Sequence, residues 1–116
     1  MDRSHRLREP YDISRTRSKG ASAASGPLVI RTLPNQLEPA RNRYTVTASK
    51  RTGKSHDRNR CKRVTREALR LLDPDLTQGN DIVVIIRGNR AELPDRDAAM
   101  RALTEMFRRT RLLNHD

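Results

Sequence analysis

The chain has 116 residues, of which 34% are apolar and 34% are charged, so its length and composition predict one small domain with a limited core. Its longest apolar run is the five residues Ile82 to Ile86, too short to cross a bilayer, and no apolar stretch near the N-terminus predicts a secretory signal. A single cysteine excludes an internal disulfide framework and favours the reducing cytoplasm.

The net charge of +11 is concentrated in one quarter of the chain. Residues 41–70 carry eleven Lys and Arg side chains against Asp57 and Glu67, an excess of +9, whereas residues 71–116 carry −1. A solvated protein surface mixes both signs, and a block of one sign repels itself unless a partner neutralises it. This distribution predicts a binding surface for a polyanion such as a nucleic acid.

The N-terminal third predicts one helix and one strand. Residues 1–8 are polar and basic, and we expect them to be mobile. Pro10 suits a first helical turn and Gly20 a stop, which favours a short helix over Pro10–Ser18. The small residues 21–26 predict a loop, and Pro27–Leu33 predicts a strand that a Pro- and Asn-rich loop follows.

The remaining elements have clearer patterns. Arg43–Ser49 alternates polar and apolar residues, as a half-buried strand does. A helix is predicted from Ser55, as N-cap, to about Leu72, a buried central strand over Asp81–Arg87, and a last helix that Asp95 opens. The order helix, strand, strand, helix, strand, helix predicts an α/β (α+β) two-layer sandwich, with helices on one face of the sheet and the other face open.

The helix after Ser55 carries the strongest functional signal. Its predicted buried stripe consists of Cys61, Val64, Ala68, Leu71 and Leu72. Arg58, Asn59, Lys62 and Arg66 fall on one flank of that stripe, and Arg60 and Arg63 fall toward the other. Arginine holds phosphate bidentately and stacks on bases, and asparagine reads ribose or base edges, so each flank can bind a different stretch of RNA.

At this motif the chain resembles the bacterial ribonuclease P protein component. The resemblance rests on Ser49-Lys50-Arg51-Thr52-Gly53-Lys54, then Arg58-Asn59-Arg60-Cys61-Lys62-Arg63 and Arg66-Glu67, and it extends from about Leu7 to Leu113. It implies one domain over residues 9–113, with residues 114–116 as a tail. It also implies the small α/β sandwich of that family, with a left-handed βαβ crossover that composition would not suggest.

The resemblance implies a role as the protein subunit of an endoribonuclease that removes the 5′ leader of precursor tRNA. The RNA subunit would perform the hydrolysis with Mg²⁺, which RNA and substrate would hold, so no catalytic or metal-binding residue is expected in this chain. The implied partners are the catalytic RNA and precursor tRNA, with a monomeric protein in a one-to-one complex in the cytoplasm and no membrane.

The resemblance also assigns RNA-binding residues. They are Ser49, Lys50, Arg51 and Lys54 in the basic turn, Arg58, Asn59, Lys62 and Arg66 toward the leader, and Arg60 and Arg63 toward the catalytic RNA. The family usually has aromatic residues in its leader cleft, where this chain has Ile13, Arg17 and Arg31. Arg31 could replace base stacking through its guanidinium, and Tyr44 could help if it faces the cleft.

Two other functions are considered. A non-enzymatic protein that binds structured RNA, of the ribosomal type, would explain the basic segment equally well. A self-contained nuclease would need a carboxylate cluster or a catalytic histidine pair, and the sequence indicates neither.

Cys61 lies on the apolar stripe of the predicted helix and is expected to be a small buried residue.

Overall fold

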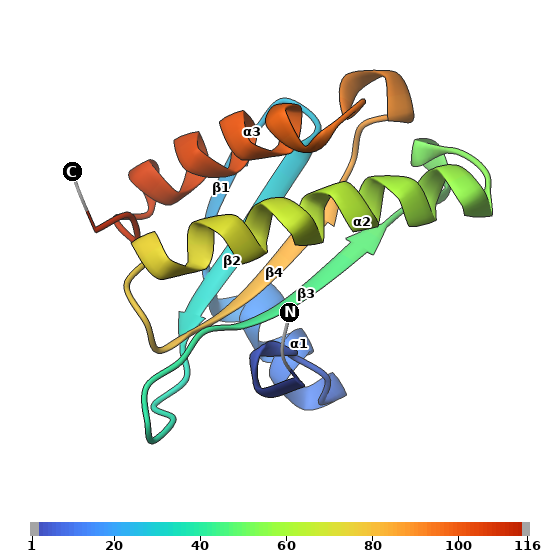
Figure 1. Ribbon diagram of the computed structural model, residues 1–116. Coiled ribbons are helices and arrows are strands. Elements are labelled where there is room, and N and C mark those ends of the chain that lie inside the picture. The colour runs from blue at the N-terminus through green and yellow to red at the C-terminus, as the bar shows by residue number, and fades with distance from the viewer. Residues whose placement is uncertain (1–2, 115–116) are drawn as a thin grey trace.

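A computed structural model describes residues 3–114 of the chain. In it, a four-stranded sheet of order β1-β2-β4-β3 is combined with three α-helices (Figure 1). None of the described helices is long and apolar enough to span a membrane. The elements are α1 (Pro10–Lys19), β1 (Ala21–Ser25), β2 (Leu28–Pro34), β3 (Arg43–Ala48), α2 (Ser55–Leu72), β4 (Asn80–Ile86) and α3 (Arg96–Arg109).

The main core lies between one face of the sheet and the helices α2 and α3. Strand register aligns Leu28 with Ile86, Ile30 with Val84, and Val84 with Val46, so these side chains form continuous rows across the strands. All of them are buried. Alternation along each strand therefore directs its other residues to the opposite face.

The connection from β3 through α2 to β4 is a parallel crossover. Figure 1 shows α2 in front of the sheet with both strands pointing up the page, and the chain moves leftward from β3 to β4. The crossover is therefore left-handed, against the usual right-handed preference. This confirms the fold that the family resemblance implied.

The prediction that all helices cover one face of the sheet is wrong, because α1 packs on β4 and β2 from the other side. Thr16 of α1 and Val83 of β4 are both completely buried. At the end of the helix, a Cβ on Gly20 would lie 2.5 Å from Thr16 O and 2.8 Å from Thr32 O. Only glycine allows the chain to pass from α1 into the sheet at this close approach.

The prediction of a loop over residues 21–26 is also wrong, because Ala21–Ser25 forms the edge strand β1 and only Gly26 lies outside it. It pairs with β2 in an antiparallel register that joins Ala23 to Ile30. Gly26, at φ +53°, makes the turn between the two strands. Small residues suit this position because α3 packs against β1.

Residues 1–8 were predicted to be mobile, but most of this segment is held against β3. Arg3–His5 forms a 3-10 turn, Arg6 bridges to Tyr44, and Leu7 is 3% exposed. The His5 ring nitrogen Nδ1 and the carbonyl oxygen of Asn42 are 2.9 Å apart. Residues 1–2 of that segment, and residues 115–116 of the predicted tail, lie outside the described residues.

Candidate nucleic-acid interface

Helix α2 places the basic motif, and its rotation about its own axis decides which side chains face outward. The buried stripe consists of Cys61, Thr65, Ala68, Leu69 and Leu72. The prediction of Leu71 for this stripe is wrong, since Leu71 is 39% exposed, whereas the predicted Val64 lies at its edge, half-buried and packed against the core. Burial of Thr65 is tolerated because its hydroxyl donates to Cys61 O at 2.8 Å.

Cys61 is fully buried, as its place on the stripe predicted. Its burial raises the pKa of its thiol, and the nearby Asp57 carboxylate adds to that shift. The residue therefore stays a neutral packing group.

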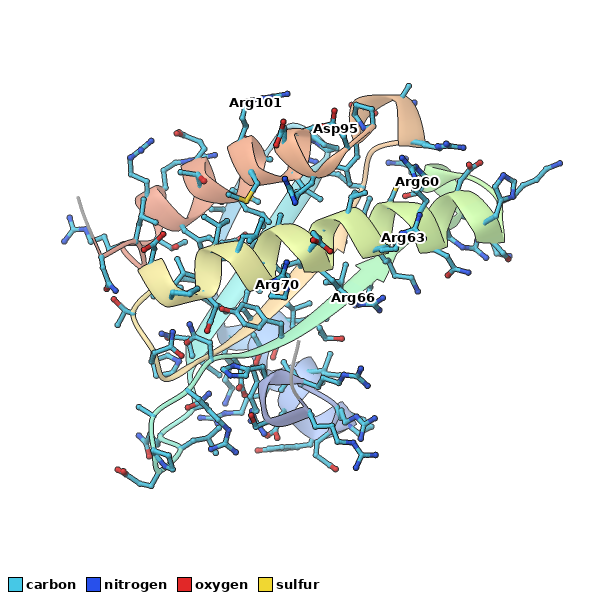
Figure 2. All side chains as sticks on the ribbon, in the orientation of Figure 1. Arg60, Arg63, Arg66, Arg70, Asp95 and Arg101 are labelled. Carbon is cyan, nitrogen blue, oxygen red and sulfur yellow. The ribbon has the colours of Figure 1, made fainter. Side chains whose placement is uncertain are left out.

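The two flanks of α2 face different surroundings (Figure 2). Arg60 lies on the side toward α3 and Arg66 on the side toward β3, with Arg63 and Arg70 between them. Arg60 is half-buried, and its Nε has no hydrogen-bond partner among residues 3–114. Arg60 and Arg66 thus point in two separate directions, as predicted, whereas Arg63 lies between them and not on the flank of Arg60.

Both acidic side chains of the basic segment are paired with cations from the β4–α3 region. Asp57 Oδ1 lies 3.2 Å from Arg90 Nη1, and Glu67 Oε1 lies 3.7 Å from Arg96 Nη1. Glu67 also contacts Arg70 at 3.1 Å. Consequently Asp57 does not neutralise its neighbour Arg58, whose Nη2 donates to Ser55 Oγ at 3.2 Å.

The motif cations therefore have no local counter-charge. Among residues 3–114, five of the six Lys and Arg side chains of α2 form no salt bridge, namely Arg58, Arg60, Lys62, Arg63 and Arg66. Unpaired guanidinium groups on a rigid helix are suited to binding phosphate, because they need not first leave a carboxylate partner.

A 3-10 turn, Lys50–Thr52, brings further cations to the start of α2. Ser49 caps this turn, since its Oγ accepts from Arg51 N at 3.3 Å. Lys50, Arg51 and Lys54 are all exposed. Lys54, rather than the predicted Ser55, is the N-cap residue of α2, and it makes no side-chain cap hydrogen bond.

Gly53 is required at the junction between this turn and α2. Its φ is +138°, and a Cβ there would lie 2.8 Å from Asp57 Oδ2. We expect Gly53→Ala to destabilise the protein by about 3 kcal/mol, because backbone strain adds to the clash. Urea unfolding checks this, with Gly26→Ala as control: Gly26 has φ +53° and no atom near its missing Cβ, so it should cost about 1 kcal/mol. Equal costs would contradict the assignment.

The residues predicted for the leader cleft do not all lie together. Ile13 and Arg17 line a shallow groove along α1 with Pro10, Ser14 and Ser18. Arg31 aligns with Val83 in the row that faces α1. Tyr44, however, aligns with Ile82 on the opposite, core-facing row and is 5% exposed.

The hydroxyl of Tyr44 is already engaged. It donates to Asp73 Oδ1, and Asn42 Nδ2 lies 3.4 Å from it. Burial, with the Asp73 carboxylate, raises the pKa of this phenol above its usual value, so it stays neutral. The structure therefore separates Tyr44 from Ile13, Arg17 and Arg31.

Sequence reasoning missed two cations, Arg6 and Arg8. Together with Arg66, they line a cavity of about 430 Å³ beside the edge strand β3. The available signal was the alternation Arg6-Leu7-Arg8, in which one apolar residue separates two basic ones, as in a half-buried extended segment.

Comparisons with known proteins place this chain beside one family. The family model described as Ribonuclease P matches residues 1–111. The chain is 40% identical over 87 residues to the ribonuclease P protein component of Caldanaerobacter subterraneus subsp. tengcongensis, covering 75% of this chain and 73% of that protein. It is also 40% identical to the namesake from Chloroflexus aurantiacus, where the match spans 75% of this chain and 63% of the relative.

Solved structures give the same result. The RNase P protein of Staphylococcus aureus superimposes with a TM-score of 0.80 at 26% identity, covering 95% of this chain and 98% of that one. The Thermotoga maritima RNase P protein gives a TM-score of 0.76 at 26% identity, covering 90% and 96%.

Proposed function

Since this chain belongs to the ribonuclease P protein family, we propose that it binds the catalytic RNA of ribonuclease P and the 5′ leader of precursor tRNA on opposite flanks of α2. The observation that carries this proposal is the pairing of Asp57 and Glu67 with Arg90 and Arg96. This pairing leaves both flanks of the helix with uncompensated positive charge. A protein placed between two polyanions needs two such surfaces.

Each flank is assigned to one RNA. Arg60, on the side toward α3, and Arg63, between Arg60 and Arg66, bind the catalytic RNA. Arg58, Asn59, Lys62 and Arg66 bind the leader, with the cations of the Lys50–Thr52 turn contributing at the start of the helix. Asn59 is the only uncharged member, and its amide can both donate to and accept from a ribose or base.

Leader bases are assigned to the face of the sheet that α1 covers in part. A single strand that follows α2 and passes the β3 edge reaches the groove of Ile13 and Arg17, with Arg31 on the same face. Guanidinium groups replace aromatic rings there as stacking surfaces for unpaired bases. Tyr44 is left out of this assignment, because its ring lies on the other face.

We place the hydrolysis on the RNA subunit. The proposed contact residues are arginine, lysine, serine and asparagine, and a cationic surface repels Mg²⁺ rather than holding it. No group of three His, Cys, Asp or Glu side chains within residues 3–114 is arranged to hold a metal ion. The protein instead lowers the repulsion between leader and catalytic RNA, as a monomer bound one-to-one in the cytoplasm.

Single-turnover cleavage of precursor tRNA by a bacterial ribonuclease P RNA at limiting Mg²⁺ tests this function. We expect the protein to stimulate cleavage, and the stimulation to grow with leader length, because added leader phosphates meet added cations. Stimulation independent of leader length would remove the leader role. No stimulation, together with tight binding to ribosomal RNA, would instead favour a structured-RNA-binding protein of the ribosomal type.

A further inference from the structure

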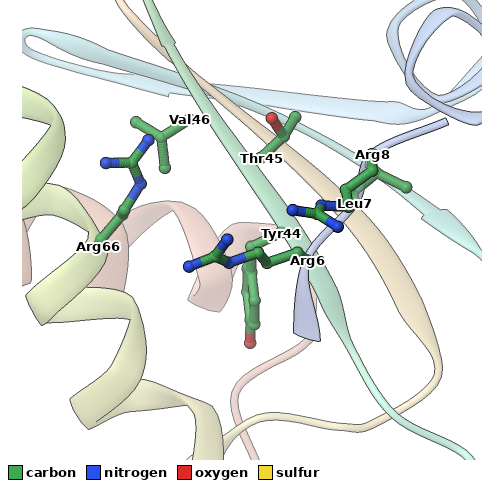
Figure 3. Close-up of a pocket in the computed structure, with 7 residues that line it drawn as sticks. All are labelled: Arg6, Leu7, Arg8, Tyr44, Thr45, Val46 and Arg66. Atoms are coloured by element: carbon green, nitrogen blue, oxygen red, sulfur yellow. The ribbon is translucent and has the colours of Figure 1, made fainter. Parts of the chain in front are cut away.

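The cavity beside β3 is built from three parts of the chain (Figure 3). The N-terminal segment contributes Arg6, Leu7 and Arg8, strand β3 contributes Tyr44, Thr45 and Val46, and α2 contributes Arg66. Figure 3 shows Arg6 extending from the N-terminal segment toward α2, Arg66 extending from α2 toward Val46, and Arg8 near Leu7 and Thr45.

The N-terminal wall is held in a defined position. Leu7 N donates to Tyr44 O at 2.8 Å, and Arg6 forms a parallel bridge with Tyr44. Because side chains alternate along an extended segment, burial of Leu7 turns both Arg6 and Arg8 away from the core. The preceding turn is fixed as well, since Arg41 Nε donates to Ser4 O at 3.0 Å.

The charge in this cavity is uncompensated. Three guanidinium groups line it, and the lining includes no carboxylate. Within residues 3–114, none of Arg6, Arg8 and Arg66 forms a salt bridge, whereas other arginines such as Arg43 and Arg90 are paired with aspartates. The Tyr44 hydroxyl offers no compensation either, because it is bonded to Asp73.

We propose that this cavity is a binding site for a phosphodiester group of RNA, held by Arg6, Arg8 and Arg66. Three like charges around one space favour an anion at their centre, and arginine binds phosphate oxygens in a bidentate manner. Leu7 and Val46 form an apolar part of the wall that excludes water and strengthens the interaction. This inference rests on the proposed RNA-binding function and extends the β3-facing flank of α2 onto the N-terminal segment.

The RNA test compares two double variants that remove the same charge. R6Q/R8Q removes both positive charges that the N-terminal segment contributes to the cavity and keeps Leu7. R15Q/R101Q removes two exposed positive charges that do not line the cavity. We expect R6Q/R8Q to weaken RNA binding about 5- to 30-fold and to lower the slope of log affinity against log salt by about 0.7 to 0.9, the value for one phosphate. The control should lose about twofold or less.

Two RNA ligands identify the source of the phosphate. If R6Q/R8Q loses affinity for isolated catalytic RNA, the bound phosphate belongs to that RNA. If the variant loses affinity only for precursor tRNA that carries a leader, the phosphate belongs to the leader. If R6Q/R8Q matches the control with both ligands while K62Q/R66Q is defective, the cavity is not a phosphate site, although the proposed function stands.

A second measurement tests the site without any RNA. Inorganic phosphate added to the free protein should shift the backbone amide resonances of Leu7 and Thr45, and R6Q/R8Q should abolish those shifts. Unchanged amides in the wild-type protein would overturn the proposal. Urea unfolding of R6Q/R8Q should match that of the wild-type protein, because both replaced side chains are exposed and Leu7 is retained.

Discussion

Replacing Arg60 and Arg63 together by glutamine should weaken binding to the catalytic RNA about 10- to 100-fold at low salt. Each lost hydrogen bond contributes on the order of 0.7 to 1.4 kcal/mol at a partly exposed site. The slope of log affinity against log salt should fall by about 1.4 to 1.8, because two phosphates lose their partners. Glutamine keeps most of the side-chain stem, which matters because Arg60 is half-buried. Filter binding over a salt series measures both quantities.

The matched comparison is K62Q/R66Q, which removes the same charge from the other flank of the same helix. This variant should leave binding to the catalytic RNA within about threefold and should chiefly weaken precursor tRNA that carries a leader, since its single-stranded phosphates are the assigned partner. Equal losses for both variants with both ligands would show that the flanks do not divide the two RNAs.

The patterned elements could be predicted from the sequence. The predicted helix from Ser55 to about Leu72 has the bounds of α2, and the strand predicted over Asp81–Arg87 is β4 within one residue at each end. Both have strong periodicity and clear end signals, so local sequence determined them. The family matches also confirm the predicted role as a protein subunit in tRNA processing.

The errors occurred where tertiary pairing decides the structure. Ala21–Ser25 has no apolar alternation, and it is a strand because β2 supplies hydrogen bonds and α3 covers it. The placement of α1 on the second face could not be read from its two apolar residues. Periodicity did place Tyr44 on the buried face of β3, where it lies, but it could not tell that α1 and the groove of Ile13 and Arg17 lie on the opposite face.

The candidate site shows the same division. The basic residues of α2 were predicted by type and spacing, whereas their freedom from counter-ions depends on Arg90 and Arg96, which are distant in sequence from Asp57 and Glu67. Arg6 and Arg8 were missed because their position depends on the docking of Leu7 against β3. Long-range contacts therefore decide which of the many arginines are available to RNA.

Asp81→Asn should destabilise the protein by about 3 to 5 kcal/mol, the largest stability effect expected of any single conservative change here. Asp81 is 5% exposed, and its two carboxylate oxygens each accept a hydrogen bond from Arg43 at 2.8 Å. It also accepts from Asn35 Nδ2 at 3.0 Å. The amide removes the charge but not the volume, so it leaves the Arg43 guanidinium without its main partner in a poorly solvated site.

The same ion pair connects α1 to the sheet, because Arg43 Nη2 also lies 3.4 Å from Asp12 Oδ2. Loss of Asp81 should therefore loosen the surface assigned to the leader, and stimulation of leader-bearing substrate should fall more than affinity for the catalytic RNA. Bound RNA should restore part of the stability, since a ligand that binds only the folded state shifts the unfolding equilibrium.

Glu105→Gln is the matched control, an acid-to-amide change at an exposed pair. Glu105 lies 3.5 Å from Arg109 on α3, and both side chains are 48% exposed. Solvent screens that pair, so its loss should cost under about 1 kcal/mol. Urea unfolding of the two variants measures the difference. Similar midpoints would mean that Arg43 finds another partner when Asp81 is neutral, and Asp12, already within 3.4 Å, would be the acceptor to replace next.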